Sequence, residues 1–153
     1  MQNISRRAII GAFTALAALA PGAVPAAEPA GEKGERVALK GYDPVAYFTD
    51  RKAEQGSAEF TASYDDATYW FKNAEHRALF VANPDRYAPQ FDGYCTIMVS
   101  RGGKYESDPE AWAIADGKLY VFSSKDGVPM FRQRRARIVA EAKSNWPALR
   151  AQP

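Results

Sequence analysis

The 153-residue chain contains one cysteine, Cys95, and one histidine, His76. A single cysteine excludes an intramolecular disulfide and the Cys-x-x-Cys motif of redox enzymes, so burial of apolar side chains must stabilise the domain. A glycine-rich phosphate loop is also absent, because Gly102-Gly103 fits neither the Walker nor the dinucleotide-binding pattern. No internal repeat is visible, and the length suits one domain.

The chain also lacks a strong net charge. Its formal charge is +2, and residues 1–27 contribute two arginines and no acid, which leaves 18 basic and 18 acidic side chains in the remainder. A neutral domain has little electrostatic attraction for nucleic acid, so we expect no nucleic-acid partner. One basic run is the exception: Arg132, Arg134, Arg135 and Arg137. We interpret this run as a solvated helix face, with phosphate or anionic lipid contact as the alternative.

The apolar run Ala8–Ala20 is too short to cross a membrane. Its 13 residues would span ~20 Å as a helix, against ~30 Å for the hydrocarbon core of a bilayer. A charged start precedes the run and small residues follow it, which is the pattern of a removable export signal. We therefore expect residues 1–27 to be a signal peptide, cleaved near Ala26 or Ala27, with no membrane insertion of the mature protein.

The start of this signal contains adjacent arginines. Ser5-Arg6-Arg7-Ala8-Ile9-Ile10 resembles the twin-arginine export motif, in which two arginines precede one variable and two apolar residues. The general secretory route is the alternative, because its signals also begin with positive charge. Both routes lead out of the bacterial cytoplasm, so we expect the mature chain in the periplasm.

The mature chain divides into a lead-in, one domain and a tail. Residues 28–36 are polar with Gly and Pro, which predicts a flexible lead-in. Residues 37–147 carry the apolar and aromatic pattern of a single domain, and residues 148–153 are expected to form the tail.

Two hairpins are predicted within this domain. Thr68-Tyr69-Trp70-Phe71 is β-branched and aromatic, which predicts a strand paired with residues 56–65. Asp116-Gly117 predicts the tight turn of a second hairpin, over residues 112–122. Residues 93–100 favour a further strand, with a buried helical turn as the alternative.

Helix signals accompany the hairpins. Asp43-Pro44 predicts the start of a short helical turn, and Asn73 predicts the cap of a helix over residues 74–82. Two more helices are expected over residues 128–132 and 134–143. The fold class is therefore α+β, with antiparallel hairpins and short helices packed on them.

Several spaced motifs between Tyr42 and Tyr94 resemble the YHS domain family. These motifs are Asp43-Pro44-Val45, Tyr64 to Phe71, Asn73-Ala74-Glu75-His76, Phe80 and Asn83 to Tyr87. The longer stretch through Cys95 and the Trp112 hairpin looks like the exported proteobacterial branch of that family. The resemblance implies a small treble-clef-like hairpin-plus-helix unit, here extended by a second antiparallel hairpin and C-terminal helices. It also implies an association with soft metals such as copper.

Most of that family's metal ligands are missing here. In metal-binding members a cysteine commonly follows Asp-Pro-Val and another follows the aromatic strand, and the corresponding residues in this chain are Ala46 and Lys72. The resemblance implies that only His76 remains of the usual ligand set. It therefore supports the fold better than it supports the family's metal site.

Three residues could still hold a soft metal ion: Cys95, His76 and Met98. A thiolate, a thioether and an imidazole suit Cu(I), and Cys95 and Met98 share a face if their segment is helical. The structural interpretation of the same residues is a satisfied histidine and a small, buried, hydrophobic cysteine.

Two functions from different classes follow. The first is a periplasmic metal-binding or metal-handling accessory of copper type that uses these three residues. The alternative is a non-metal structural or interaction domain that has kept the fold and lost the ligands, with a protein partner that the sequence does not name. A thiol enzyme built on Cys95 and His76 is a third hypothesis, but the sequence favours a non-enzymatic domain, and no catalytic residue is assigned.

Overall fold

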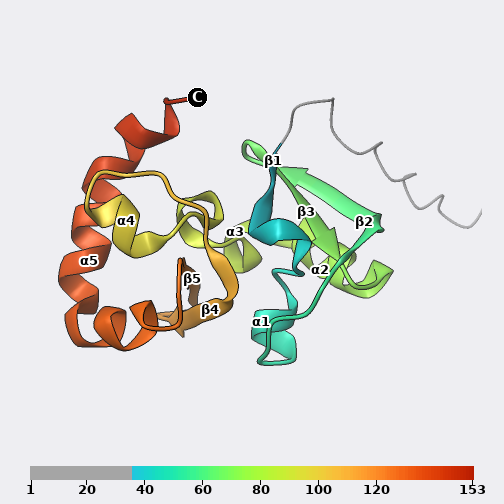
Figure 1. Cartoon of the computed structure of the whole chain (residues 1–153). Helices are drawn as coiled ribbons and strands as arrows, with labels where there is room; N and C mark the ends of the chain where they lie inside the picture. Colours follow the sequence, from blue (N-terminus) through green and yellow to red (C-terminus); the bar gives the residue numbers. More distant parts are fainter. Residues whose placement is uncertain (1–35) are drawn as a thin grey trace, which may run out of the picture.

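The computed structural model describes residues 36–153, so the predicted signal peptide and all but the last residue of the lead-in lie outside the described residues. Two halves lie side by side, each with a β-hairpin and helices (Figure 1). The predicted α+β class is confirmed: there is a three-stranded mixed sheet, a separate two-stranded hairpin and a long C-terminal helix. None of the helices in this part of the chain combines the length and apolar character needed to cross a bilayer.

The first half carries the three-stranded sheet. Its elements, with η for a 3-10 helix, are β1 (Arg36–Val37), η1 (Ala38–Gly41), α1 (Ala46–Thr49), β2 (Ser57–Tyr64), β3 (Ala67–Phe71), α2 (Ala74–Ala82) and α3 (Pro84–Tyr87). The central strand β3 pairs antiparallel with β2 and parallel with β1. The predicted hairpin over residues 56–71 is therefore confirmed. So is the predicted helix cap, because the Asn73 side chain accepts the backbone N–H of His76 at 2.8 Å.

The second half carries the separate hairpin and the longest helix. Its elements are η2 (Gln90–Gly93), α4 (Thr96–Ser100), β4 (Asp108–Ala115), β5 (Lys118–Phe122) and α5 (Gly127–Arg150). Asp116 and Gly117 connect β4 to β5 with φ of 50° and 70°. A two-residue turn with two positive φ angles matches the right-handed twist of the strands, and glycine adopts such an angle without strain. The predicted Asp-Gly hairpin is confirmed.

Two sequence predictions for this half were wrong. The strand favoured for residues 93–100 is the helix α4, which was the stated alternative. Tyr94 forms a single bridge to Glu106, and beyond it the segment has no strand partner among the described residues. Its backbone groups bond within a helical turn instead, as in Val99 N–H to Cys95 O at 2.9 Å.

The two helices predicted after residue 128 correspond to the two helical segments of α5, and the second prediction that was wrong is where the last helix ends. Helix α5 is broken at Arg134, where φ is −125° and ψ is 22°, and it continues to Arg150. The helix thus extends beyond Trp146-Pro147, where we expected the fold to end. Because Leu149 is buried in the core, the first residues of the predicted tail belong to the packed domain.

The second half repeats the topology of the first, although no repeat is visible in the sequence. Each half begins with a left-handed turn that precedes a Gly-Tyr pair: the φ angles are 52°, 51° and 82° over 39–41, and 57°, 51° and 78° over 91–93. Each tyrosine then forms an antiparallel bridge, Tyr42 to Gln55 and Tyr94 to Glu106. Each half continues through a short helix, a hairpin and a further helix.

The two hairpins match in detail. In each, a strand of 8 residues pairs with a strand of 5 residues, and a bulge interrupts the register after the first residue of the longer strand. In each hairpin, the shorter strand also pairs in parallel with a segment that precedes the left-handed turn. This segment is β1 in the first half and Pro89 in the second. Shared backbone geometry, rather than shared side chains, defines this repeat.

Strand β5 joins the two halves through its two faces. Alternate side chains of a strand point to opposite sides, and here Leu119 and Val121 pack in the core of the first half, whereas Tyr120 and Phe122 pack in the core of the second. The hydroxyl of Tyr47 adds a link, since it donates to the carbonyl of Pro109 at 2.9 Å. The halves are therefore one packed unit.

Candidate functional site

The polar centre of the first half is the carboxylate of Asp43, which has no solvent exposure. One oxygen, Oδ1, accepts the N–H of Val45 at 2.8 Å and so caps the turn that leads into α1. The other, Oδ2, accepts the N–H of Lys72 at 2.9 Å and lies 2.7 Å from Nδ1 of His76. The predicted capping role of Asp43 is confirmed, and the carboxylate also joins β3 and α2.

His76 is oriented by its neighbours in α2 and by Asp43. It is the third residue of α2, in the first turn that Asn73 caps. An ionised carboxylate can only accept, so the bond to Asp43 places a proton on Nδ1 of the imidazole. The side chain is only 7% exposed, and its other nitrogen, Nε2, lies on the opposite edge of the ring.

A cluster of charged side chains borders that edge. Nε2 of His76 lies 3.4 Å from the hydroxyl of Thr49 and 3.9 Å from Oδ2 of Asp50. The ammonium of Lys72 binds the same Asp50 oxygen at 2.5 Å and Oε2 of Glu54 at 2.7 Å. The Asp50 carboxylate next to the imidazole is therefore already paired with a cation of the chain itself.

The pKa values in this cluster follow from these ion pairs. The hydrogen bond from Lys72 holds the pKa of Asp50 below its usual range. Hydrogen bonds from Lys52 and then from Lys72 lower the pKa of Glu54. The same bonds to Asp50 and Glu54 raise the pKa of Lys72. All three groups are thus charged at neutral pH.

Cys95 and Met98 lie in the other half. Cys95 directly precedes α4, is 3% exposed and packs in the second core with Phe91, Ile97 and Val99. Within residues 36–153 the structure gives its thiol no hydrogen bond. Met98 is partly buried against the same core. Only Met98 lies within α4, because Cys95 is the residue before the helix and its ψ is 111°, so the helical condition for a shared face holds for one of the two sulfurs.

The structure does not assemble the three predicted metal ligands as one set. His76 bonds to Asp43 in the first half, whereas Cys95 and Met98 pack in the core of the second. In the part of the chain that the structure describes, no three His, Cys, Asp or Glu side chains are grouped so that they could hold a metal ion. At the two positions where the resemblance noted in the sequence implies cysteines, Ala46 is fully buried and Lys72 is ion-paired. The residues present do not fit a soft metal ion.

Sequence reasoning missed most of the cluster around His76. Asp43 was recognised as a cap but not as the partner of the imidazole, since the two are 33 residues apart. Asp50, Glu54 and Lys72 carried no motif, and their meeting depends on the fold. Comparison with protein-family models, with curated proteins and with solved structures finds no match to this chain.

Proposed function

We propose that this chain is a metal-independent structural or interaction domain of the bacterial periplasm, in which Asp43 and His76 hold the fold together. The observation that carries the proposal is the bonding of the buried Asp43 carboxylate. Both of its oxygens are used inside the protein, by three backbone N–H groups and one imidazole. A carboxylate bonded in this way has no free oxygen to offer a ligand or a substrate.

The surroundings of His76 support the same function. A general base needs access to the proton that it removes, and a metal-ligating imidazole needs other ligands around the ion. The Nε2 edge of His76 meets Asp50 and Thr49, and the carboxylate of Asp50 is bound by Lys72. A resident ammonium thus supplies the positive charge that a metal would otherwise bring.

The resemblance noted in the sequence is compatible with a domain that keeps its fold without a metal ion. The hairpin β2–β3 followed by α2 suits the treble-clef-like unit that the YHS resemblance implies. An exported domain of that kind that has lost its cysteines and gained a lysine keeps the fold without the ion. Export through the predicted signal then places an interaction domain in the periplasm.

The bond between Asp43 and His76 also fits the competing function, metal binding, so an experiment must distinguish the two functions. A carboxylate bonded to Nδ1 is also how proteins orient a histidine that binds metal through Nε2. We therefore propose elemental analysis of the full chain recovered from the periplasm, followed by an anaerobic Cu(I) titration of wild type, Cys95→Ser and His76→Gln.

We expect no stoichiometric metal in the recovered protein and no difference in Cu(I) uptake between wild type and the two variants. Stoichiometric copper that Cys95→Ser or His76→Gln loses, with the circular dichroism spectrum unchanged, would overturn the proposal and restore the metal-binding function. Recovery from the periplasm matters, because affinity alone allows a protein to take up whichever ion is available.

A further inference from the structure

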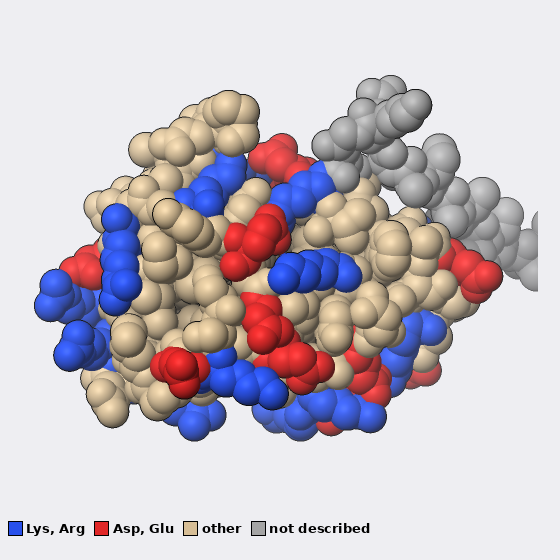
Figure 2. Space-filling view, viewed as in Figure 1, with Lys and Arg blue, Asp and Glu red and all other residues tan. Residues whose placement is uncertain are grey.

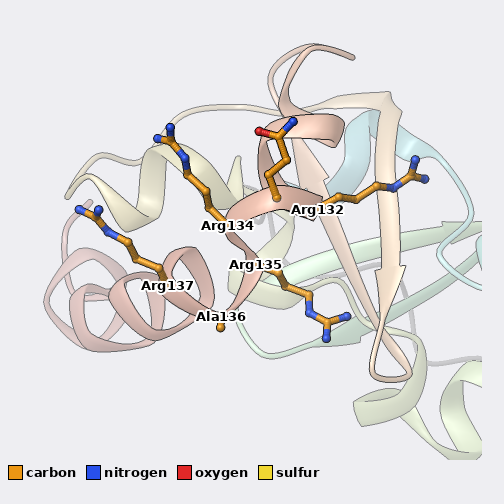
Figure 3. A pocket seen from close by; sticks show the side chains of 6 residues that line it. Arg132, Arg134, Arg135, Ala136 and Arg137 are labelled. Atoms are coloured by element: carbon orange, nitrogen blue, oxygen red, sulfur yellow. The ribbon is translucent and has the colours of Figure 1, made fainter.

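A positively charged pocket lies where α5 is broken, beside α4. The pocket measures ≈170 Å³, and its lining includes three arginines: Arg101 at the end of α4, and Arg134 and Arg137 at the break. Figure 3 draws the neighbouring, more open hollow that residues 132–137 line. In it the side chains of Arg134 and Arg137 extend to one side of the helix, whereas those of Arg132 and Arg135 extend to the other. The break thus divides the basic run into two groups.

The positive charge of this pocket is only partly balanced by acidic side chains of residues 36–153. Residues 127–140 contain four arginines and no acid. Among the described residues, Arg134 forms no ion pair, and the guanidinium of Arg101 has only the sulfur of Met130 at 3.9 Å, which is a weak acceptor. Arg137 pairs with Glu141 at 2.7 Å. Three guanidiniums therefore face one carboxylate.

The charges on the surface agree with this excess of arginine. Basic side chains gather at the left edge of the face in Figure 2, where Figure 1 places α5, whereas both signs are interspersed over the middle of that face. A solvated helix face, our first interpretation of the run, explains Arg132 and Arg135. It does not explain why the break in α5 sets Arg134 and Arg137 beside an arginine of another element.

We propose that Arg101, Arg134 and Arg137 form a binding site for a phosphate group. A guanidinium presents paired N–H donors that match two oxygens of a phosphate, and several of them together provide both charge and orientation. The pocket is smaller than the ~300–1,000 Å³ of sites for drug-sized ligands, so it suits a single phosphate. Ile97 and Ile138 line the same pocket and suit an apolar group attached to that phosphate.

The phosphate can come from solution or from the headgroup of an anionic phospholipid. The full chain is therefore titrated with inorganic phosphate, and separately sedimented with vesicles of phosphatidylglycerol in phosphatidylcholine and with vesicles of phosphatidylcholine alone. Binding to inorganic phosphate but not to vesicles assigns a soluble ligand. Binding that requires phosphatidylglycerol assigns the headgroup, and either result supports the site.

Single arginine variants decide whether the pocket or the general charge is responsible. Arg134→Gln and Arg101→Gln each remove a charged hydrogen-bonding group from the pocket and should weaken binding about tenfold. Arg132→Gln is the matched control, since it removes the same charge from the other side of α5, and it should leave binding nearly unchanged. Glu141→Gln should tighten binding, because it releases Arg137.

Two results would overturn the site. One is that neither inorganic phosphate nor phosphatidylglycerol vesicles bind. The other is that Arg132→Gln weakens binding as much as Arg134→Gln does, which is the behaviour of a diffuse basic surface. All four side chains are on the surface, and the urea midpoint of each variant checks that the fold is intact. The outcome is independent of whether His76 binds a metal.

Discussion

The two halves of this protein build the same backbone plan around opposite chemistry. Asp43 and Cys95 occupy equivalent places, each directly after a Gly-Tyr pair and before a short helix. Asp43 is buried with hydrogen bonds on both oxygens, whereas Cys95 is buried among apolar side chains. The same turn can therefore present either a polar or an apolar group to the interior, provided that the surroundings match.

The partners of these residues differ accordingly. His76 and Gly127 each follow the last residue of their hairpin by the same distance in sequence. His76 fills its place with an imidazole, but a Cβ at Gly127 would lie 2.8 Å from Cβ of Phe122 and 3.3 Å from Cδ1 of Ile97. The second half thus uses hydrocarbon where the first uses a hydrogen-bond network, and a side chain can be exchanged only together with its neighbours.

The largest expected effect is at the equivalent pair Asp43 and Cys95. Asp43→Ala leaves four donors, three of them in buried bonds, without their acceptor and should lower the free energy of unfolding by about 3–5 kcal/mol. Cys95→Ala removes one buried sulfur and should cost about 1 kcal/mol. Urea unfolding followed by circular dichroism measures both. If the two variants lost the same free energy of unfolding, the hydrogen-bonded Asp43 would contribute no more than the apolar Cys95, which contradicts their contacts.

Gly127→Ala tests the tighter packing of the second half. The added methyl group must displace Phe122 or Ile97, so we expect a loss of about 1–3 kcal/mol in the free energy of unfolding, even though alanine favours a helix more than glycine does. Ser124→Ala, in the exposed loop just before, is the control and should change stability by less than about 0.5 kcal/mol. A Gly127→Ala protein as stable as this control would contradict the packing argument.

Thr96→Val should stabilise the second half. Thr96 is fully buried, and within the described residues its hydroxyl has no hydrogen-bond partner. Valine has the same shape without the polar group, so the change should raise the free energy of unfolding by about 1 kcal/mol. Thermal unfolding of this variant beside Thr68→Val provides the comparison. If Thr96→Val lowers the stability instead, the Thr96 hydroxyl must have a hydrogen-bond partner. The second core would then also contain a bonded polar group, as the first core does.

The smallest effect concerns the ion pairs beside His76. Asp50 and Glu54 have lowered pKa values in the folded protein. Their stabilising effect is therefore present above the unfolded pKa, at about 4, and is lost as the pH falls through the folded values. Lys72→Met removes the cation, so it should cost up to about 1 kcal/mol at pH 7 and make stability less dependent on acid pH.

Urea unfolding at neutral pH and at about pH 3 tests this prediction. The difference between wild type and Lys72→Met should shrink at the lower pH, because the unfolded chain binds protons there that the ion-paired carboxylates of the folded wild type resist. Arg51→Met changes a nearby exposed cation that forms no ion pair in the described structure and serves as the control. A difference that stays constant with pH would mean that Lys72 acts through packing rather than charge.

Local signals in the sequence located most of the secondary structure. The Asp116-Gly117 turn, the aromatic strand at Thr68–Phe71 and the Asn73 cap each depend on residues close together in the chain, and all three predictions are confirmed. The helix α4 was predicted as a strand because its β-branched residues favour either state when buried. Only the absence of a partner strand decided between them, and the sequence does not show that absence.

The candidate site was predictable in part. His76 was identified because it is the only histidine, and Asp43 was identified as a cap because it precedes a proline. Their bond, and the pairing of Lys72 with Asp50 and Glu54, join residues 18 to 33 positions apart. Contacts at that separation depend on how the hairpin packs against α1 and α2, which no local pattern encodes.

The sequence by itself determined the α+β class, the two tight hairpins, the capped helix and the presence of a single thiol and a single imidazole, because each of these depends on residue type or short-range spacing. The tertiary structure alone decided that thiol and imidazole lie in different halves, that the second half repeats the first, and that three arginines meet at the break in α5. The physical reason is that backbone turns and core packing decide which residues far apart in the sequence come into contact. Different sets of side chains can also stabilise the same backbone conformation.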